Sequence, residues 1–203
     1  MIANQYKSRS EIPAENWVAL MLWDNAHYPI NYVTGKESLS ERFAKIRANY
    51  ATKARAVNDG ADAWERSDPY ELADWMKIFS PIEYSAWCEI RGAGLPLWPQ
   101  FPVGKFFVDF GNPEYKVALE CDGKDYHNAA KDAERDRILS GMGWKVFRAP
   151  GWRCNKQMKR PGELQAEEGQ EVTNEYREAF ERQTLAGIIN DLRESLGRRG
   201  WTW

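Results

Sequence analysis

Two acidic residues interrupt the most apolar, strand-like segments of this 203-residue chain. Asp109 lies within Phe-Phe-Val-Asp-Phe at 106–110, and Glu120 lies within Lys-Val-Ala-Leu-Glu-Cys at 116–121. A carboxylate in a buried strand costs folding free energy unless it is paired with a cation or bound to a metal. Two such carboxylates on neighbouring strands predict a shared cation, and hard oxygen ligands favour Mg²⁺, Mn²⁺ or Ca²⁺.

The loop between these two strands decides whether Asp109 and Glu120 can meet. Residues 111–114 read as the turn of a hairpin. An odd loop would put the two carboxylates on opposite faces, and a four-residue loop would leave them roughly 13 Å apart along the strands. We therefore expect an even loop of six residues or more, or an equivalent bulge, because that makes them diagonal neighbours.

The first 80 residues show helical spacing. Trp17, Leu20 and Met21 predict one apolar face, and a second helix, capped by Ser38 or Ser40, should end near residues 58–60. A third helix is expected from the Asp-Pro pair at 68–69 through residue 79. This part of the chain, residues 1–79, is predicted to be a helical N-terminal region.

Further along, the apolar period changes from helical to strand-like. Ser80, Pro81 and Glu83 have the pattern of a capping box at a helix start, and the glycines at 92 and 94 should end that helix. The two strands of the hairpin, a helix over 129–142 and a strand over 144–148 follow. This order predicts an α/β core with a mixed central sheet over 80–160. Residues 154–171 are expected to be loop, and a helix over 173–196 completes a C-terminal extension, 161–203.

Charge and cysteine content exclude several classes of protein. The chain has 28 basic and 30 acidic residues, which argues against a protein that holds nucleic acid by charge alone. A local basic groove formed by Arg153, Lys156, Lys159 and Arg160 is compatible with this charge balance, although a solvated loop also explains that cluster. Three cysteines spaced 33 residues apart, with two histidines, favour free thiols over a zinc site. No stretch resembles a membrane span or a secretory signal, so we expect a cytoplasmic protein with no membrane partner.

Six short stretches occur together in one order: Ser80–Glu83, Trp98–Gly104, Val108–Phe110, Glu120–Gly123 with His127, Asp132–Asp136 and Gly143–Arg148. Taken together, they resemble the very-short-patch-repair-like endonucleases of the PD-(D/E)XK superfamily, which has the restriction-endonuclease fold. The resemblance covers about a third of the chain. It implies a mixed sheet flanked by helices, and a bacterial or phage enzyme of DNA repair, restriction or phage DNA processing.

The resemblance also implies Mg²⁺- or Mn²⁺-dependent hydrolysis of phosphodiester bonds in DNA. Asp109 and Glu120 would hold the metal, joined by Glu83 directly or through water. Arg135 would point toward the site, and Gln100 would approach the phosphate. Arg153 and Lys156 are the expected DNA contacts outside the acidic site.

The chain departs from the superfamily pattern where a general base is expected. Asp122 stands where the signature has a lysine, and Val108 stands where it has a proline. Lys124 or His127 could take the missing role, since both follow on the same connection, and a histidine titrates near neutrality. The general base therefore stays open.

Each of these residues could also have a purely structural role. Glu83 could serve only the capping box, Asp109 could point to water from an edge strand, Glu120 could pair with Arg148, and Asp122 could be a turn residue. In the same way, a loop hydrogen bond would account for Gln100, solvation for Lys124, a helix cap for His127, and surface ion pairs for Asp132, Arg135 and Asp136.

Alternatives exist for the whole chain as well. A catalytically silent restriction-like fold could act in DNA binding or assembly, and a small-molecule metallohydrolase would need a closed pocket. An arginine filling the space between Asp109 and Glu120 would argue against a metal. Trp201 and Trp203 could stack on bases, pack on the body of the protein, or pack on a second subunit, so a homodimer stays open.

Overall fold

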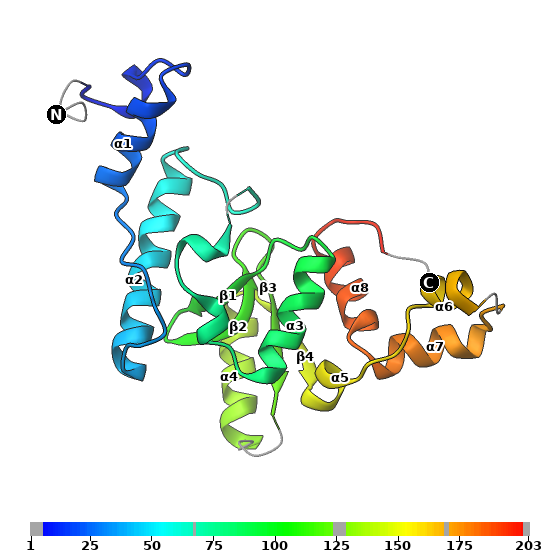
Figure 1. Cartoon of the computed structure of the whole chain (residues 1–203). Helices are drawn as coiled ribbons and strands as arrows, with labels where there is room; N and C mark the ends of the chain where they lie inside the picture. The colour runs from blue at the N-terminus through cyan, green and yellow to red at the C-terminus, as the bar shows by residue number, and fades with distance from the viewer. Residues whose placement is uncertain (1–5, 67, 124–128, 169–170, 201–203) are drawn as a thin grey trace. The chain divides into compact units, whose positions relative to one another are not determined.

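The protein divides into two units, Met1–Ile78 and Phe79–Trp203 (Figure 1). The structure is a computed structural model and describes residues 6–66, 68–123, 129–168 and 171–200. The side chains of residues 129–132 and 167–168 lie outside this description. Each unit has its own fold, and the second contains the sheet.

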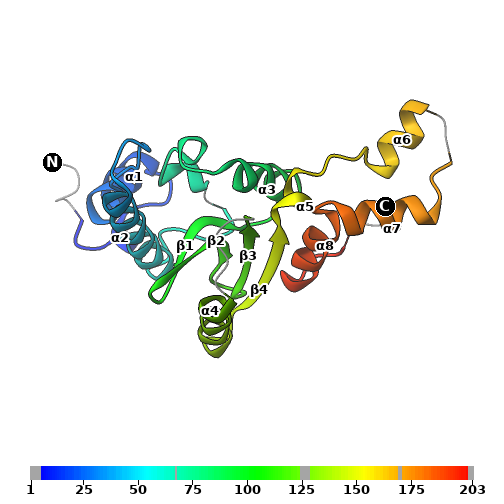
Figure 2. The ribbon, with the colours of Figure 1, turned by 90° about the horizontal axis from the view of Figure 1, so that it is seen from below.

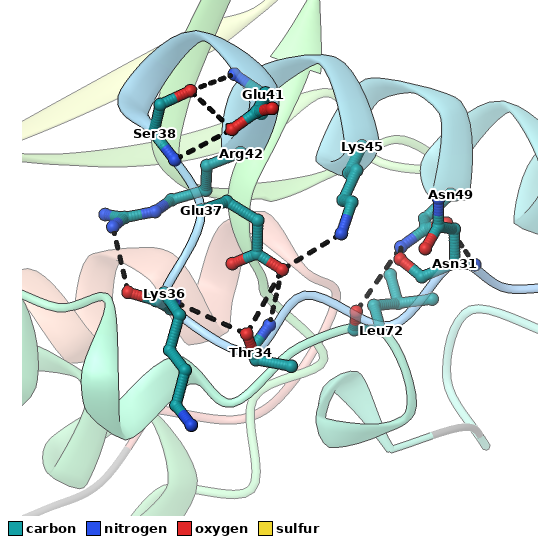
Figure 3. Close-up of polar contacts among 11 residues, drawn as sticks. Asn31, Thr34, Lys36, Glu37, Ser38, Glu41, Arg42, Lys45, Asn49 and Leu72 are labelled. Atoms are coloured by element: carbon teal, nitrogen blue, oxygen red, sulfur yellow. Dashed lines mark hydrogen bonds and ion pairs between the residues drawn. The ribbon is translucent and has the colours of Figure 1, made fainter.

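In the first unit, helix α2 (Leu39–Asn58) begins at a complete capping box. The Ser38 hydroxyl accepts a hydrogen bond from the Glu41 N–H, and the Glu41 carboxylate accepts one from the Ser38 N–H (Figure 3). Such a box satisfies two of the N–H groups that a helix start leaves without partners. The predicted second helix is confirmed, with Ser38 as its cap and Asn58 as its last residue.

The preceding helix, α1 (Trp17–His27), turns a different face inward from the one predicted. Ala19 and Trp23 are buried, whereas Trp17 is 69% exposed and Met21 is 47% exposed. The segment Trp-Val-Ala-Leu-Met-Leu-Trp is apolar all around, so its spacing did not single out one face.

The third predicted helix of this unit is wrong. Residues 69–77 form two 3-10 turns, η3 (Pro69–Glu71) and η4 (Trp75–Lys77). Between them, Val33 forms an isolated bridge with Ala73, donating its N–H to the Leu72 carbonyl and accepting the Asp74 N–H at its own carbonyl. The buried Asn49 amide also donates to the Leu72 carbonyl (Figure 3). Partners distant in sequence therefore replace the bonds of a continuous helix.

The second unit contains a mixed sheet, as predicted, and its strand order is β1-β2-β3-β4. Its strands are β1 (Trp98–Val103), β2 (Phe106–Asn112), β3 (Val117–Asp122) and β4 (Lys145–Pro150). The first three strands are antiparallel, and β4 runs parallel to β3. Helix α3 (Pro81–Gly92) covers one face and helix α4 (Ala129–Gly141) lies on the other (Figure 2).

The core of this unit packs α3 against the middle of the sheet. Trp87 of α3 stacks on Phe110 of β2, with ring centroids 5.8 Å apart, and both side chains are buried. The Ser80–Glu83 capping box is present, and it fixes the first turn of α3. The start of this helix is thereby held beside the strands that contain the two acids.

Strand β1 does not follow from the spacing of apolar residues, because Pro99 and Pro102 lie within it. Proline has no N–H for a ladder and is tolerated at sheet edges. In the sheet that the structure describes, β1 is the edge strand beside β2, which explains why it accepts both prolines.

After β4 the chain is more helical than expected. The predicted loop over 154–171 contains the end of α5 (Gly151–Asn155) and the whole of α6 (Pro161–Glu168). The single predicted last helix is two helices, α7 (Asn174–Gln183) and α8 (Ala186–Ser195). The break lies at Thr184, whose hydroxyl donates to the Phe180 carbonyl and accepts the Ala186 N–H. This local bonding ends α7 and starts α8.

Among the described residues, none of the helices combines the length and the apolar character needed to cross a membrane.

Candidate active site

The register of the β2–β3 hairpin places Asp109 across from Glu120. Phe110 pairs with Leu119 and Asn112 pairs with Val117, so the next position of the same register joins the two acids. The expectation of a loop of six residues or more is wrong. The strand continues through Asn112, and the four residues 113–116 then suffice. Residues across an antiparallel pair share a face, so both carboxylates lie on one side of the sheet.

Asp109 is half-buried where the ladder ends. Its Oδ2 accepts a hydrogen bond from the Cys121 N–H at 2.8 Å, and it forms no ion pair with another described residue. Loss of solvent around the carboxyl and, second, the negative charge of Glu83 together raise the pKa of Asp109 to about 7. A desolvated carboxylate without a cation is the situation that a bound metal relieves.

Glu120 is buried, with 6% of its side chain exposed, but it has a cationic partner. Arg135 of α4 donates from Nη2 to Glu120 Oε1 at 2.5 Å and to the Phe107 carbonyl. The pKa of Glu120 is nevertheless raised to about 8, first by burial and then by the charge of Asp109. Arg135 thus offsets only part of the repulsion. Its Nε is buried without a hydrogen-bond partner among the described residues.

Glu83 performs its capping role and also belongs to the acidic group. One carboxylate oxygen accepts the Ser80 N–H at 2.7 Å, and the other accepts a hydrogen bond from the Gln100 side-chain amide. Gln100 has a φ of +47°, unusual for a residue other than glycine, and the β1–β2 register sets it across from Asp109. Backbone strain of this kind is concentrated at functional sites. The hydrogen bond to Glu83 holds Gln100 at the edge of the acidic group.

Asp122 and Arg148 form a second polar group at the ends of β3 and β4. Arg148 donates to Asp122 at 2.8 Å and to Asp136 of α4 at 2.6 Å. The alternative that Arg148 pairs with Glu120 is wrong, although the two residues are register partners. The interpretation of Asp122 as only a turn residue is also wrong, because its carboxylate makes this ion pair.

Replacing Arg148 by Met is expected to destabilise the protein by about 1–3 kcal/mol, because two carboxylates lose a shared, half-buried partner. The matched change, Arg137→Met, breaks an exposed pair with Glu134 on the same helix and should cost much less, because solvent screens that pair. Urea unfolding of both variants, followed by tryptophan fluorescence, measures the difference. Equal losses would mean that the Arg148 bridge contributes no more than a surface pair.

The remaining predicted site residues are only partly placed. Lys124, His127 and the side chain of Asp132 lie outside the described residues. Arg153 donates to the carbonyls of Thr184 and Glu181 at 2.8 Å, which gives it a structural role at the end of α7. Lys156 is exposed.

The chemistry of the donors fits a divalent cation with few protein ligands. In the part of the chain that the structure describes, no three His, Cys, Asp or Glu side chains are arranged to hold a metal. Mg²⁺ usually keeps several waters and uses one or two carboxylates together with substrate phosphates. Asp109 and Glu120 can supply those two carboxylates. Burial and neighbouring negative charges raise the pKa values of both, and a bound cation would compensate the negative charge of the ionised carboxylates.

Sequence reasoning missed Arg148 and Asp136 as members of the site. The only available signal was that Arg148, in the strand-like run 144–148, could reach an acid of the neighbouring strand. Which acid it reaches depends on side-chain geometry at the strand ends, where Arg135 already contacts Glu120.

A family model described as REase_MTES_1575, a restriction-endonuclease-like family, matches residues 83–160, which include every acid of the site. No curated protein and no solved structure matched the chain. The mixed sheet and its flanking helices are consistent with the restriction-endonuclease-like core that this match indicates for residues 83–160.

Proposed function

We propose that the protein is a metal-dependent DNA endonuclease in which Asp109 and Glu120 hold Mg²⁺ or Mn²⁺. The observation that supports this most is the pair of carboxylates across one register position, of which Glu120 is buried and Asp109 has no cationic partner among the described residues. A fold that served only as a scaffold would gain stability by replacing one of them. A bound cation would polarise the scissile phosphate and lower the pKa of the attacking water.

The neighbouring residues have supporting roles in this proposal. Glu83 joins the metal through water, since both of its oxygens already accept hydrogen bonds. Arg135 keeps Glu120 oriented through their ion pair. Gln100 is a further donor for the DNA backbone. Asp122 is held by Arg148. The candidates for the general base are Asp122, Lys124 and His127.

Nicking of supercoiled plasmid tests the proposal. The full chain is expected to nick DNA with Mg²⁺ or Mn²⁺ and not with EDTA. Glu120→Gln should slow nicking by about 100-fold or more, because it removes a metal ligand while keeping an acceptor for Arg135. Glu114→Gln, an exposed acid in the same hairpin, is the matched control and should nick like the parent. Equal rates for Glu120→Gln and Glu114→Gln would remove Glu120 from the mechanism.

One observation favours a second function, a catalytically silent fold that binds DNA. Arg135 already compensates Glu120, so one of the two acids has a partner without any metal. This alternative predicts DNA binding that is the same in Mg²⁺ and in EDTA, and no nicking under either condition. The plasmid assay and a binding titration in both buffers separate the two functions.

A further inference from the structure

Two cysteines lie together on the face of the sheet opposite the acids. Cys121 follows Glu120 on β3, so its side chain projects from the other face of the strand, on the side of α3. Cys154 belongs to α5, which lies on that same side of the sheet (Figure 2). Both thiols are free, and the proposed hydrolysis of DNA uses neither of them.

The pairing of β3 with β4 places the two cysteines next to each other. Cys121 lies beside Ala149 in the parallel register, and the Cys154 thiol donates a hydrogen bond to the Ala149 carbonyl at 3.8 Å. The start of α5 is packed closely on β3, since a Cβ built on Gly151 would lie 3.1 Å from the Asp122 carbonyl. The backbone therefore holds Cys154 next to the strand position that Cys121 occupies.

The two thiols also contact each other directly, through a hydrogen bond between the side chains of Cys121 and Cys154. A disulfide requires the sulfur atoms to approach to about 2.05 Å, and thiols that share a hydrogen bond start close to that arrangement. Buried cysteines that only fill space in a core need no contact with one another. Their mutual contact is thus the feature that packing alone does not require.

A small oxidant can reach this pair from one side. Cys154 lines a cleft of about 580 Å³ within the second unit, and the exposed Cys88 of α3 lines the same cleft. Only 7% of Cys154 is exposed, and Cys121 is half-buried. Hydrogen peroxide, which is little larger than water, fits this access better than a bulky organic disulfide.

We propose that Cys121 and Cys154 are a redox-sensitive pair, which a peroxide closes to a disulfide and a thiol reductant opens again. In the first step, one thiol takes an oxygen atom from hydrogen peroxide and becomes a sulfenic acid, and one water is released. The second thiol then attacks that sulfur, the S–S bond forms, and the sulfenic oxygen leaves as a second water. Together the two sulfurs lose two electrons and two protons, and the peroxide is reduced to two waters.

The disulfide would link α5 to the strand that holds the acids. The Cys121 N–H donates to Asp109 Oδ2 at 2.8 Å, so the bridge would restrain the backbone group that holds this carboxylate. It would also close a loop between cysteines 33 residues apart, which restricts the unfolded chain. The oxidised protein should therefore be more stable than the reduced protein, whether or not the protein cleaves DNA.

Oxidation of the full chain with Cys88→Ser tests the proposal, because this change removes the exposed third thiol. After treatment with excess hydrogen peroxide, thiol titration of the unfolded protein should find none of the two remaining thiols, and dithiothreitol should restore both. Tryptic peptides 117–124 and 154–156 should then run as one linked species, two hydrogens lighter than their sum. The oxidised protein should have a Tm about 5 °C or more above that of the reduced protein.

The matched control adds Cys121→Ala to Cys88→Ser, which leaves Cys154 without a partner, so peroxide should not raise its Tm. If that variant does not fold, the peptide map of the parent chain decides, since it needs no further substitution. Loss of both thiols without a linked peptide, or a bridge from Cys154 to Cys88 in the parent chain, would overturn the proposal. Either result would leave the nuclease proposal standing, and a protein that never nicks plasmid would leave the thiol pair standing.

Discussion

The Asp109→Asn variant is expected to be more heat-stable than the parent protein above pH 8 in EDTA and to have lost plasmid nicking by about 100-fold or more. Both effects come from the same carboxylate. Desolvation and the charge of Glu83 raise its pKa to about 7, so the ionised form is disfavoured in the folded protein. An amide keeps an acceptor for the Cys121 N–H and removes the charge.

The stability gain depends on pH in a defined direction. In the unfolded chain Asp109 ionises near its ordinary pKa of 3.8, well below its value in the folded protein. The folded protein therefore binds more protons between about pH 4 and pH 8, and its free energy of unfolding falls as the pH rises through that window. Above pH 8 the Asn variant should be more stable by about 2–4 kcal/mol, roughly 5–15 °C in Tm. At pH 4 the two proteins should unfold at similar temperatures.

Thermal unfolding at pH 4, 7 and 9, in EDTA and in Mg²⁺, measures this effect. Mg²⁺ should raise the Tm of the parent at pH 9 and leave that of Asp109→Asn nearly unchanged, because one ligand is missing. Glu114→Gln removes an exposed charge from the neighbouring turn and should follow the parent at every pH. A parent that is as stable as Asp109→Asn at pH 9 in EDTA would show that the acidic site has no unmet charge.

The second large effect is expected for Phe110→Ala, with a loss of about 3–5 kcal/mol in the free energy of unfolding. Phe110 is fully buried, stacks on Trp87 of α3 and contacts Phe79, so truncation leaves a cavity between the helix and the sheet. Tyr115→Ala, in the exposed turn of the same hairpin, should cost about 0.5 kcal/mol or less. Urea unfolding of both variants tests the difference.

Phe110→Ala should also impair cleavage, because Phe110 lies next to Asp109 and fixes β2 against α3. The expected sign is a lower nicking rate at a temperature where the variant is still folded by circular dichroism. Unchanged nicking in a destabilised variant would show that the two acids keep their positions without this packing.

Local signals in the sequence predicted the helix starts well. Ser38 with Glu41 and Ser80 with Glu83 are capping boxes whose bonds involve residues only three apart, so no tertiary information was needed. The segments that were wrong depend on distant partners. The bridge from Val33 interrupts the predicted helix after Pro69, and an edge position admits the prolines of β1.

The candidate site was also predictable only where local pattern decides it. Alternation along two strands together with an even loop puts Asp109 and Glu120 on one face, but the predicted loop length was wrong because the end of the first strand was set two residues early. Partner choice was not predictable, since Arg135 and Arg148 both come within reach of several acids. Which arginine reaches which acid is set by α4, whose packing on the sheet the spacing of residues does not encode.

The prolines of β1 have a consequence for the behaviour of the protein in concentrated solution. A strand at the border of a sheet is a template on which further chains can grow, and missing N–H groups make it a poor template. Because Pro99 and Pro102 remove two of six donors from β1, fibril growth from this border is disfavoured. The sheet of the second unit therefore has built-in protection against self-association along β1.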